Sequence, residues 1–346
     1  YLTTNSAGSG PYVATSHDPR EGTPLAINTK YSGTFAENAP ETVRIRYGID
    51  AATVRTLFSR GELDISRVPL TTEVLASLSA TEGVKLTTDK SLSLFTYKLN
   101  TMRAPTDDPA FRTAISLAFD YAAMGQLLSV GDIKLGYPAS GPLPRGVLGY
   151  DPDRPARARD IEAAKAALAQ SKYKPGDYTL DLLRIPEAPQ QEKYALLFQQ
   201  NMSELGINVN IVTAPWAQLQ QLAQTAEATP HVTSVYVALQ TPDPDSLFWP
   251  EYHSSASGTF TAMEWYHTPE LDAKLAEGRR LTSVADRQTF YKALSDEVIA
   301  QNTALYIYER AGAVVLSSNV TAPSLEDMNL AVPLLSGNFQ FRLMSV

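Results

Sequence analysis

Cysteine is absent from the 346-residue chain. The protein therefore has no disulfide framework, no thiol nucleophile and no thiolate ligand for a metal. Long apolar runs are absent as well, because no window approaches the roughly eighteen consecutive apolar residues of a membrane span. The first residues lack the charged and apolar regions of a secretory signal. We therefore expect a chain that does not span a membrane.

Basic residues are outnumbered, with 29 Lys and Arg against 37 Asp and Glu and a formal net charge of −8. This balance argues against nucleic acid and anionic membrane surfaces as partners, since both select a basic face. The deficit is greatest between Tyr194 and Ala273, where no Lys or Arg occurs. The acids of this interval are Glu204, Glu227, Asp243, Asp245, Glu251, Glu264, Glu270 and Asp272. The pattern predicts a wall that faces a neutral or cationic ligand rather than an anion.

Catalytic signatures are missing too. The sequence contains no G-x-S-x-G, H-E-x-x-H or P-loop motif, and the glycines at 8 and 10 lack the third glycine of a dinucleotide-binding loop. The histidines are scattered without metal-ligand spacing, at His17, His231, His253 and His267. We predict no enzymatic activity, no catalytic residue, no metal site and no cofactor. One enzymatic alternative stays open, because Asp243 and Asp245 supply two carboxylates of the type that a glycosidase uses.

A chain of 346 residues exceeds what one hydrophobic core usually supports, so about two domains are expected. Three successive patterns predict a βαβ unit: a strand at 178–185, a helix at 190–205 and a strand at 207–213. Such a crossover makes parallel neighbours. Three later elements are also expected: helices at 269–281 and 285–300 and a strand at 304–316. The centre of the chain is therefore predicted to be an α/β domain.

Short strand patterns dominate the first hundred residues. One helix is expected among them, capped by Asp50 and stopped by Gly61. Since strand-rich material also follows the α/β centre, we expect two lobes and two crossings between them, near 97–101 and near 305–314. Two crossings make a hinge.

The segment His231–Gly258 is the predicted ligand edge. Its apolar run Val232–Leu239 is rich in β-branched and aromatic residues, and Pro242 and Pro244 follow that run. Because proline cannot donate to a sheet ladder, the strand should end there. Ligands collect beyond the carboxyl ends of strands in open α/β sheets.

Six segments, in order along the chain, carry a family resemblance. They are GSGPY at 8–12, a helix followed by GELDI within 50–65, DPAFRTAISLAFD at 108–120, ELGINVNI at 204–211, PDPDSL at 242–247 and PELDAKL at 269–275. No single segment is specific for a family, but six such segments in this order are hard to attribute to chance. The chain resembles the extracellular solute-binding proteins of family 5, the peptide and nickel group that feed ABC importers.

The resemblance implies a periplasmic-binding-protein-like, two-lobed α/β fold of type II, cluster C, which closes over its ligand at a hinge. Complete members have a further part of lobe I and a small extra domain before the GSGPY segment. The N-terminal part of the fold is therefore expected to be absent here. The implied division is a middle segment of lobe I at 1–98, lobe II at 99–314, and a C-terminal segment of lobe I at 315–346.

The implied function is that of the solute-binding component of an ABC importer. The expected ligand is an oligopeptide, or a neutral or cationic small molecule such as an opine- or sugar-like compound. The expected partners are this ligand and the permease subunits, with the protein acting as a monomer. Its expected place is the periplasm or the cell exterior, with lipid anchoring to the cell surface as one form. A ligand sensor with the same fold and no transport role is the other alternative.

The implied ligand strand contains Tyr236, Val237 and Ala238. In peptide-binding relatives the matching strand runs beside the bound peptide and offers it main-chain hydrogen bonds. The position after it often holds an Asp that receives the peptide's α-amino group, and here it holds Gln240. A neutral amide forfeits the charge assistance that strengthens such a contact. Val237 stands where relatives have an aromatic residue, so a standard peptide is not the favoured ligand.

Three further residues complete the predicted ligand set: Asp243, Trp249 and Tyr308. Each has a structural alternative. Asp243 is favoured as a cap of the following helix over a ligand contact. Trp249 either stacks on ligand or fills the core. Of Tyr306 and Tyr308, one is expected to reach the ligand and the other to pack.

Overall fold

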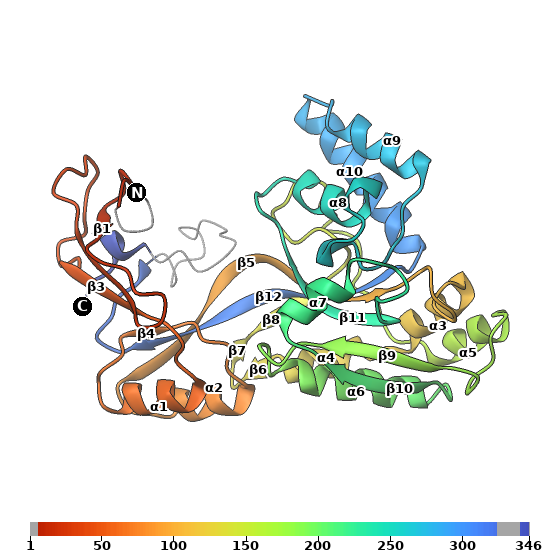
Figure 1. The fold of residues 1–346 in the computed structure, drawn as a ribbon, viewed down its shortest axis with the longest axis horizontal. Helices are drawn as coiled ribbons and strands as arrows, with labels where there is room; N and C mark the ends of the chain where they lie inside the picture. Colours follow the sequence, from red (N-terminus) through yellow and green to blue (C-terminus); the bar gives the residue numbers. More distant parts are fainter. Residues whose placement is uncertain (1–5, 324–339, 346) are drawn as a thin grey trace.

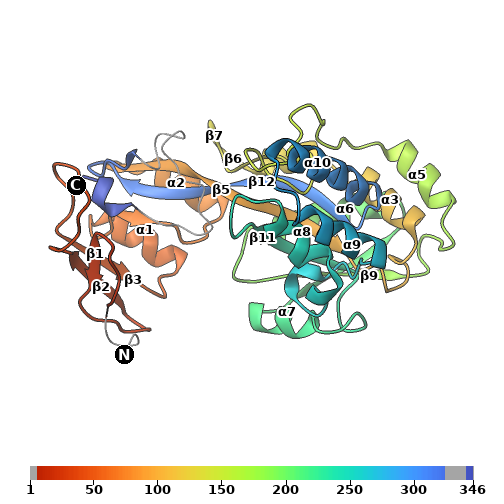
Figure 2. The same ribbon diagram turned by 90° about the horizontal axis from the view of Figure 1, so that it is seen from above.

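The computed structural model describes residues 6–323 and 340–345. Two bodies are joined by a ribbon of two long antiparallel strands, β5 (Val84–Leu99) and β12 (Ala304–Ser317) (Figure 1). The smaller body holds residues 6–83, 318–323 and 340–345, and the larger body holds residues 100–303. Figure 2 shows from above that the ribbon passes from one body into the other.

The smaller body combines an antiparallel sheet with two helices. The sheet has the order β1-β2-β3. The elements are β1 (Tyr12–Ala14), β2 (Gly22–Ile27), β3 (Thr42–Arg46), α1 (Ala51–Ser59), β4 (Ile65–Ser66), α2 (Thr72–Ser79) and the 3₁₀ turn η3 (Phe341–Leu343). The carboxylate of Asp50 caps α1 by accepting the N–H of Thr53 at 2.7 Å, as predicted.

The second helix of the smaller body, α2, was not among the expected elements. The hydroxyl of Thr71 caps it by accepting the N–H of Val74. Leu75 and Leu78 lie on its buried face, one turn apart. Both leucines pack with Val130, which comes from the larger body. The two bodies therefore share an apolar contact besides the ribbon.

The larger body is built from helices packed on both faces of one sheet. Its helices are α3 (Pro109–Ala118), α4 (Tyr121–Leu127), α5 (Ile161–Ala169), α6 (Gln191–Ser203), α7 (Trp216–Leu222), α8 (Asp245–Tyr252), α9 (Pro269–Gly278) and α10 (Val284–Ala300), with 3₁₀ turns η1 (Ser254–Ala256) and η2 (Phe260–Ala262). Its strands are β6 (Ser129–Val130), β7 (Ile133–Lys134), β8 (Gly136–Pro138), β9 (Thr179–Arg184), β10 (Asn208–Thr213) and β11 (Val232–Ala238). The predicted α/β class is confirmed.

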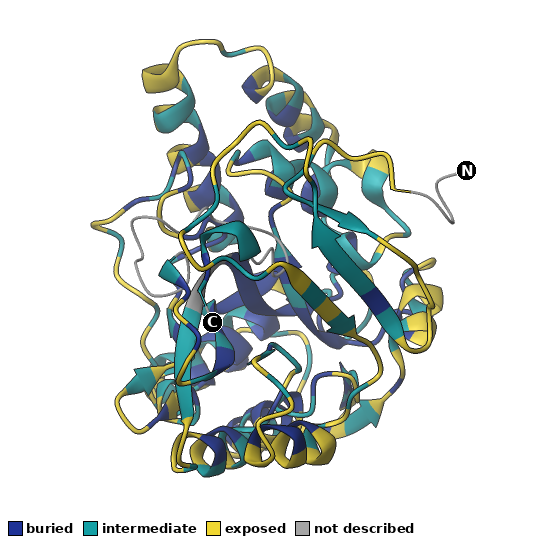
Figure 3. Ribbon diagram, turned by 90° about the vertical axis from the view of Figure 1, so that its left-hand side faces the viewer, coloured by how far each residue is buried: buried dark blue, intermediate teal, exposed yellow. Residues whose placement is uncertain are grey.

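The main sheet is mixed and runs through both bodies, with the order β10-β9-β11-β5-β12-β4 and β8 beside β12. β10 and β11 are both parallel to β9, which confirms the predicted βαβ unit. One apolar cluster lies between the sheet and α3 to α6, and a second lies between the sheet and α7 to α10. Figure 3 shows buried residues along the sheet and exposed residues on the outer turns of the helices.

The ribbon is longer than the sequence predicted. From Ser93 to Leu99, β5 pairs with β11 of the larger body, and near the other end of the ribbon β12 pairs with β4. The chain therefore enters the larger sheet at Ser93, ahead of the expected crossing near 97–101. The ladder between β5 and β12 is irregular at two places, between Tyr306 and Tyr308 and between Glu309 and Ala311.

The predicted segment boundaries at 98 and 314 remain predictions. Within the predicted C-terminal segment 315–346, residues 324–339 and 346 lie outside the described residues.

Candidate functional site

The predicted ligand strand, β11, has one edge that is only partly paired. Along one side it pairs with β5 over its whole length, from Val232 to Ala238. Along the other side it pairs with β9 only at Val232 and Thr233. Beyond Thr233, no other strand of the described residues pairs with that side. The main chain there can accept an extended ligand as an added strand.

Side chains of β11 alternate between the two faces of the sheet. Val235 and Val237 are buried in the cluster on the α7 to α10 side, and Val237 is only 4% exposed. Tyr236 and Ala238 are partly exposed, and Tyr236 packs against the cluster on the other face. Val237 can therefore offer a ligand its main chain but not its side chain.

The hydroxyl of Tyr236 is the centre of a hydrogen-bond chain. It lies 3.0 Å from the hydroxyl of Tyr308 and receives the amide N–H of Gln190 at 2.9 Å. Tyr308 donates in turn to Tyr194 at 3.5 Å. Tyr308 is 2% exposed, and burial raises the pKa of its hydroxyl well above the usual range. Tyr308 is therefore connected to the site only through its hydrogen bond with Tyr236.

The other tyrosine of β12, Tyr306, is buried as well. Its hydroxyl lies 2.6 Å from that of Tyr252 on the opposite face. Both tyrosines are thus buried in apolar clusters, on either side of the interrupted ladder, and the contact of one of them with ligand stays a prediction.

Gln240 follows the strand and is exposed. The N–H of Leu239, just before it, is fixed by the carbonyl of Leu92 at 2.9 Å. No side-chain hydrogen bond of Gln240 is found within residues 6–323 and 340–345. The amide of Gln240 is therefore held near the strand end with its donor and acceptor available.

The next polar residues, Asp243 and Asp245, have structural partners. One oxygen of Asp243 accepts the N–H of Asp245 at 2.9 Å, just before α8, whose N-cap position is Pro244 and has no side-chain cap bond. Arg287 donates to both oxygens of Asp243, at 2.9 and 2.7 Å. Arg279 donates to both oxygens of Asp245, at 2.8 and 3.0 Å. Both carboxylates are thus held by arginine.

Trp249 has both faces of its ring covered. The guanidinium of Arg279 lies 3.2 Å from the ring centroid, and the ring of His253 stacks with a centroid distance of 3.7 Å. A ligand could stack on Trp249 only after one of these side chains had moved.

The acids of the predicted wall are largely neutralised by bases from outside it. Five of the eight form ion pairs: Glu204 with Arg159, Asp243 with Arg287, Asp245 with Arg279, and Glu251 and Glu264 with Lys98. Bases distant in sequence therefore lie beside most of these acids in the fold, and the expected preference for a neutral or cationic ligand stays a prediction.

Lys98, Glu251 and Glu264 form a closed cluster inside the larger body. The Nζ of Lys98 lies 3.3 Å from Glu251 and 3.0 Å from Glu264, and no side chain of the three is more than 2% exposed. Burial raises the pKa of Glu251 to about 7, against the lowering effect of Lys98. One ammonium thus faces two carboxyl groups, which favours retention of a proton by the cluster.

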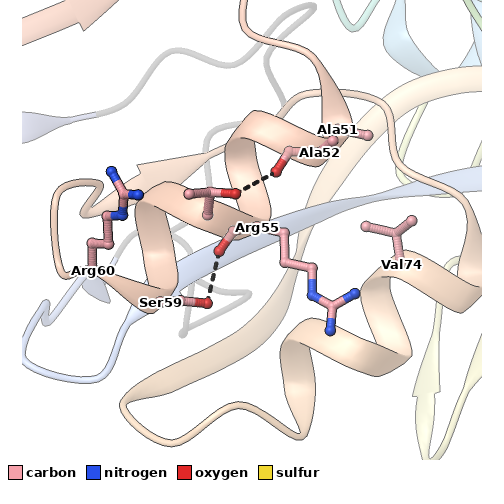
Figure 4. A pocket seen from close by; sticks show the side chains of 7 residues that line it. Ala51, Ala52, Arg55, Ser59, Arg60 and Val74 are labelled. Carbon is pink, nitrogen blue, oxygen red and sulfur yellow. Dashed lines mark hydrogen bonds between the residues drawn. The ribbon is translucent and has the colours of Figure 1, made fainter.

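A separate pocket of about 680 Å³ lies on the smaller body, between α1 and α2 (Figure 4). The hydroxyls of Thr56 and Ser59 bond back to the carbonyls of their own helix, at 3.1 and 2.9 Å. Arg55 and Arg60 are the charged groups that line it. None of the predicted ligand residues belongs to this pocket.

No cluster of at least three His, Cys, Asp or Glu side chains suited to a metal ion occurs among the residues that the structure describes. In the same residues, every helix is too short or too polar to cross a membrane.

Residues 1–259 match the family described as bacterial extracellular solute-binding proteins, family 5 Middle. The probable D,D-dipeptide-binding periplasmic protein DdpA of Escherichia coli is 26% identical over 322 residues, which are 92% of this chain and 60% of that protein. Heme-binding protein A of Haemophilus influenzae is 26% identical over 310 residues, 88% of this chain and 54% of that protein. The chain thus spans little more than half the length of these relatives.

A solved structure described as the dipeptide binding protein from Pseudoalteromonas sp. SM9913 in complex with Met-Leu matches with a TM-score of 0.78. Its sequence is 22% identical, and the match covers 97% of this chain and 64% of that one. The predicted periplasmic-binding-protein-like fold is thereby confirmed.

Proposed function

The chain belongs to family 5 of the bacterial extracellular solute-binding proteins, and from that premise we propose that it is the solute-binding component of an ABC importer. It captures a small solute, either an oligopeptide or a compact opine- or sugar-like compound, and delivers it to permease subunits. The observation that carries this proposal is the edge of β11 beyond Thr233, with which no strand of the described residues pairs. Peptide-like groups bind such an edge by strand addition.

In this proposal the predicted site residues divide into two groups. Tyr236, Val237 and Ala238 present main-chain groups to the solute, and Gln240 binds its amino or hydroxyl end. The second group supports the first, since Asp243, Trp249 and Tyr308 fix the strand and the loop after it through partners within the protein.

Capture requires relative motion of the two bodies about the ribbon. A solute that binds the closed form more tightly shifts the equilibrium toward closure by that difference in affinity. We propose that this happens without chemistry. The glycosidase alternative is not favoured, because Asp243 and Asp245 are each held by two hydrogen bonds to an arginine.

The proposed place of action is the periplasm or the cell exterior, where the names of relatives place them. We propose that the protein acts there as a monomer, free or anchored by lipid.

Calorimetry on the full-length protein tests the proposed ligand strand with trialanine as probe. Gln240→Ala should weaken binding about ten- to a hundredfold, the loss of one hydrogen bond to a charged group. Gln220→Ala, an exposed glutamine of α7, is the matched control and should bind as the natural protein does. N-acetyl-trialanine lacks the ammonium and should not distinguish the Gln240 variant. Tight binding of trialanine that is insensitive to Gln240→Ala would overturn the role of this residue.

A further inference from the structure

Arg310 lies on β12 where the ladder with β5 is interrupted, between Glu309 and Ala311. Its guanidinium carbon lies over the ring of Tyr236, 5.2 Å from the centroid. The residue is partly exposed. In residues 6–323 and 340–345 its side chain makes no hydrogen bond or ion pair. Arg310 therefore brings a positive charge to the ligand strand without a carboxylate of its own.

A comparable arrangement at Arg145 differs in one respect. Arg145 also lies over a tyrosine ring, 5.0 Å from the centroid of Tyr137. Its Nε donates to one oxygen of Glu309 at 3.2 Å, and its main-chain N–H donates to the other oxygen at 3.2 Å. The acid adjacent to Arg310 in sequence thus has both oxygens engaged by Arg145, so it does not serve Arg310.

Two other bases, Arg184 and Lys193, have carboxylate partners of their own. Arg184 pairs with Glu192 at 3.4 Å, and Lys193 pairs with Glu73. Burial, with the charge of Arg310 as a second cause, lowers the pKa of Arg67 to about 10. A second guanidinium is thus close enough for Arg310 to repel it.

We propose that Arg310 binds a carboxylate group of the solute beside Tyr236. This assignment rests on the proposed solute-binding function and gives the chemical class of the ligand. A guanidinium stacked on an aromatic ring keeps the N–H groups at its edge free, and two of them match the two oxygens of a carboxylate. The counter-charge for an anionic solute then comes from the ribbon, not from the base-free interval 194–273.

Two measurements on the full-length protein test the assignment. The first follows the Nε–H signals of arginine by NMR while sodium acetate or neutral acetamide is added. The signal that disappears in Arg310→Gln is the Nε–H of Arg310. Added acetate should shift this signal until the site is saturated, whereas acetamide should leave it unchanged. The second compares trialanine with trialanine amide by calorimetry. The free carboxylate should bind at least tenfold more tightly, and Arg310→Gln should remove that preference.

The matched control is the double variant Arg145→Gln with Glu309→Gln, which removes a neutral ion pair beside Arg310 and leaves the net charge unchanged. It should keep the tenfold preference. Equal binding of trialanine and its amide by the natural protein, or an unchanged preference in Arg310→Gln, would overturn the assignment. Saturation by inorganic phosphate at lower concentration than by acetate would also overturn it.

The two proposals fail in different ways. If neither peptide binds but acetate saturates the Arg310 signal, the carboxylate site stands and the peptide form of the proposed function fails. If trialanine binds and acetate has no saturable effect, the solute-binding function stands and Arg310 is not its carboxylate site. If trialanine does not bind and acetate has no saturable effect, the assignment to Arg310 is rejected.

Discussion

The interior of the larger body and the junction between the bodies contain lysine–glutamate pairs in opposite surroundings. In the interior, Lys98 meets Glu251 and Glu264, and all three side chains are almost fully removed from solvent. At the junction, Lys193 of α6 meets Glu73 of α2, and these side chains are 44% and 61% exposed. The buried ion pairs of Lys98 therefore contribute to the stability of the fold, whereas the exposed pair of Lys193 and Glu73 has almost no effect on it.

The difference teaches which contacts fix the fold and which can change during function. A buried charge that loses its partner has no water to replace it, whereas an exposed one is solvated at once. The interior of the larger body is thus fixed by buried ion pairs that are costly to break. The junction can open and close without breaking a costly pair.

The largest effect on the free energy of unfolding is expected when the interior cluster of Lys98, Glu251 and Glu264 is broken. Lys98→Met leaves two buried carboxyl groups without a cation and should lower the free energy of unfolding by about 3–5 kcal/mol. Urea denaturation followed by circular dichroism measures this. Lys274→Met is the control, because Lys274 pairs with Glu297 on the surface and should cost no more than about 1 kcal/mol. Equal losses in the two variants would refute the contrast between interior and surface.

A smaller effect appears in the pH dependence of stability. Because burial raises the folded-state pKa of Glu251 to about 7, its contribution to stability is complete below its unfolded pKa of 4.5 and is lost as pH rises to about 7. The loss is about 3 kcal/mol at about 1.4 kcal/mol per pKa unit. Glu251→Gln should remove this loss.

The measurement is the difference in unfolding free energy between the natural protein and Glu251→Gln, taken from pH 4.5 to pH 7.5. A difference is required because His231 acts in the opposite direction. Burial lowers the pKa of His231 to about 4, so its contribution is present above its unfolded pKa of 6.5 and is lost as pH falls toward 4. A difference curve that is flat would show that Glu251 does not titrate in this range.

The smallest effect is expected at the junction. The hydrogen bond from Lys193 lowers the pKa of Glu73 to about 2, but solvent screens the exposed pair. Lys193→Gln should change the unfolding free energy by at most about 1 kcal/mol, and by less at high salt. Lys165→Gln removes a similar exposed pair within α5 and is the matched control. A loss well above that of the control would make the junction a structural contact instead.

The elements with strong local signals were predictable from sequence. Asp50 caps its helix as expected, Asp108 caps α3 in the same way, and Gly206 takes the positive φ of 71° that ends the helix before β10. These features depend on residues within one turn of each other. The helix α2 carried a similar signal, with Thr71 as cap and leucines one turn apart, and could have been found in the same way.

The charge pairing of the site was not predictable, because it depends on tertiary structure. Asp243 and its partner Arg287 are 44 residues apart, and Lys98 and Glu264 are 166 residues apart. The sequence therefore shows an interval without bases, while in the fold five of its eight acids pair with bases from outside it. The first half of β5 was also missed, since its strand conformation comes from pairing with β12 and not from an apolar pattern of its own.

The interruption of the ladder beside Arg310 has a consequence for selectivity. Ladder pairing with β5 resumes on both sides of the interruption, so the main chain can bend there while both paired stretches remain intact. In the proposed function, motion of the bodies would then consume little of the free energy of solute binding. Most of that free energy would remain to distinguish one solute from another, and a close analogue that lacks a single contact would lose the full binding free energy of that contact.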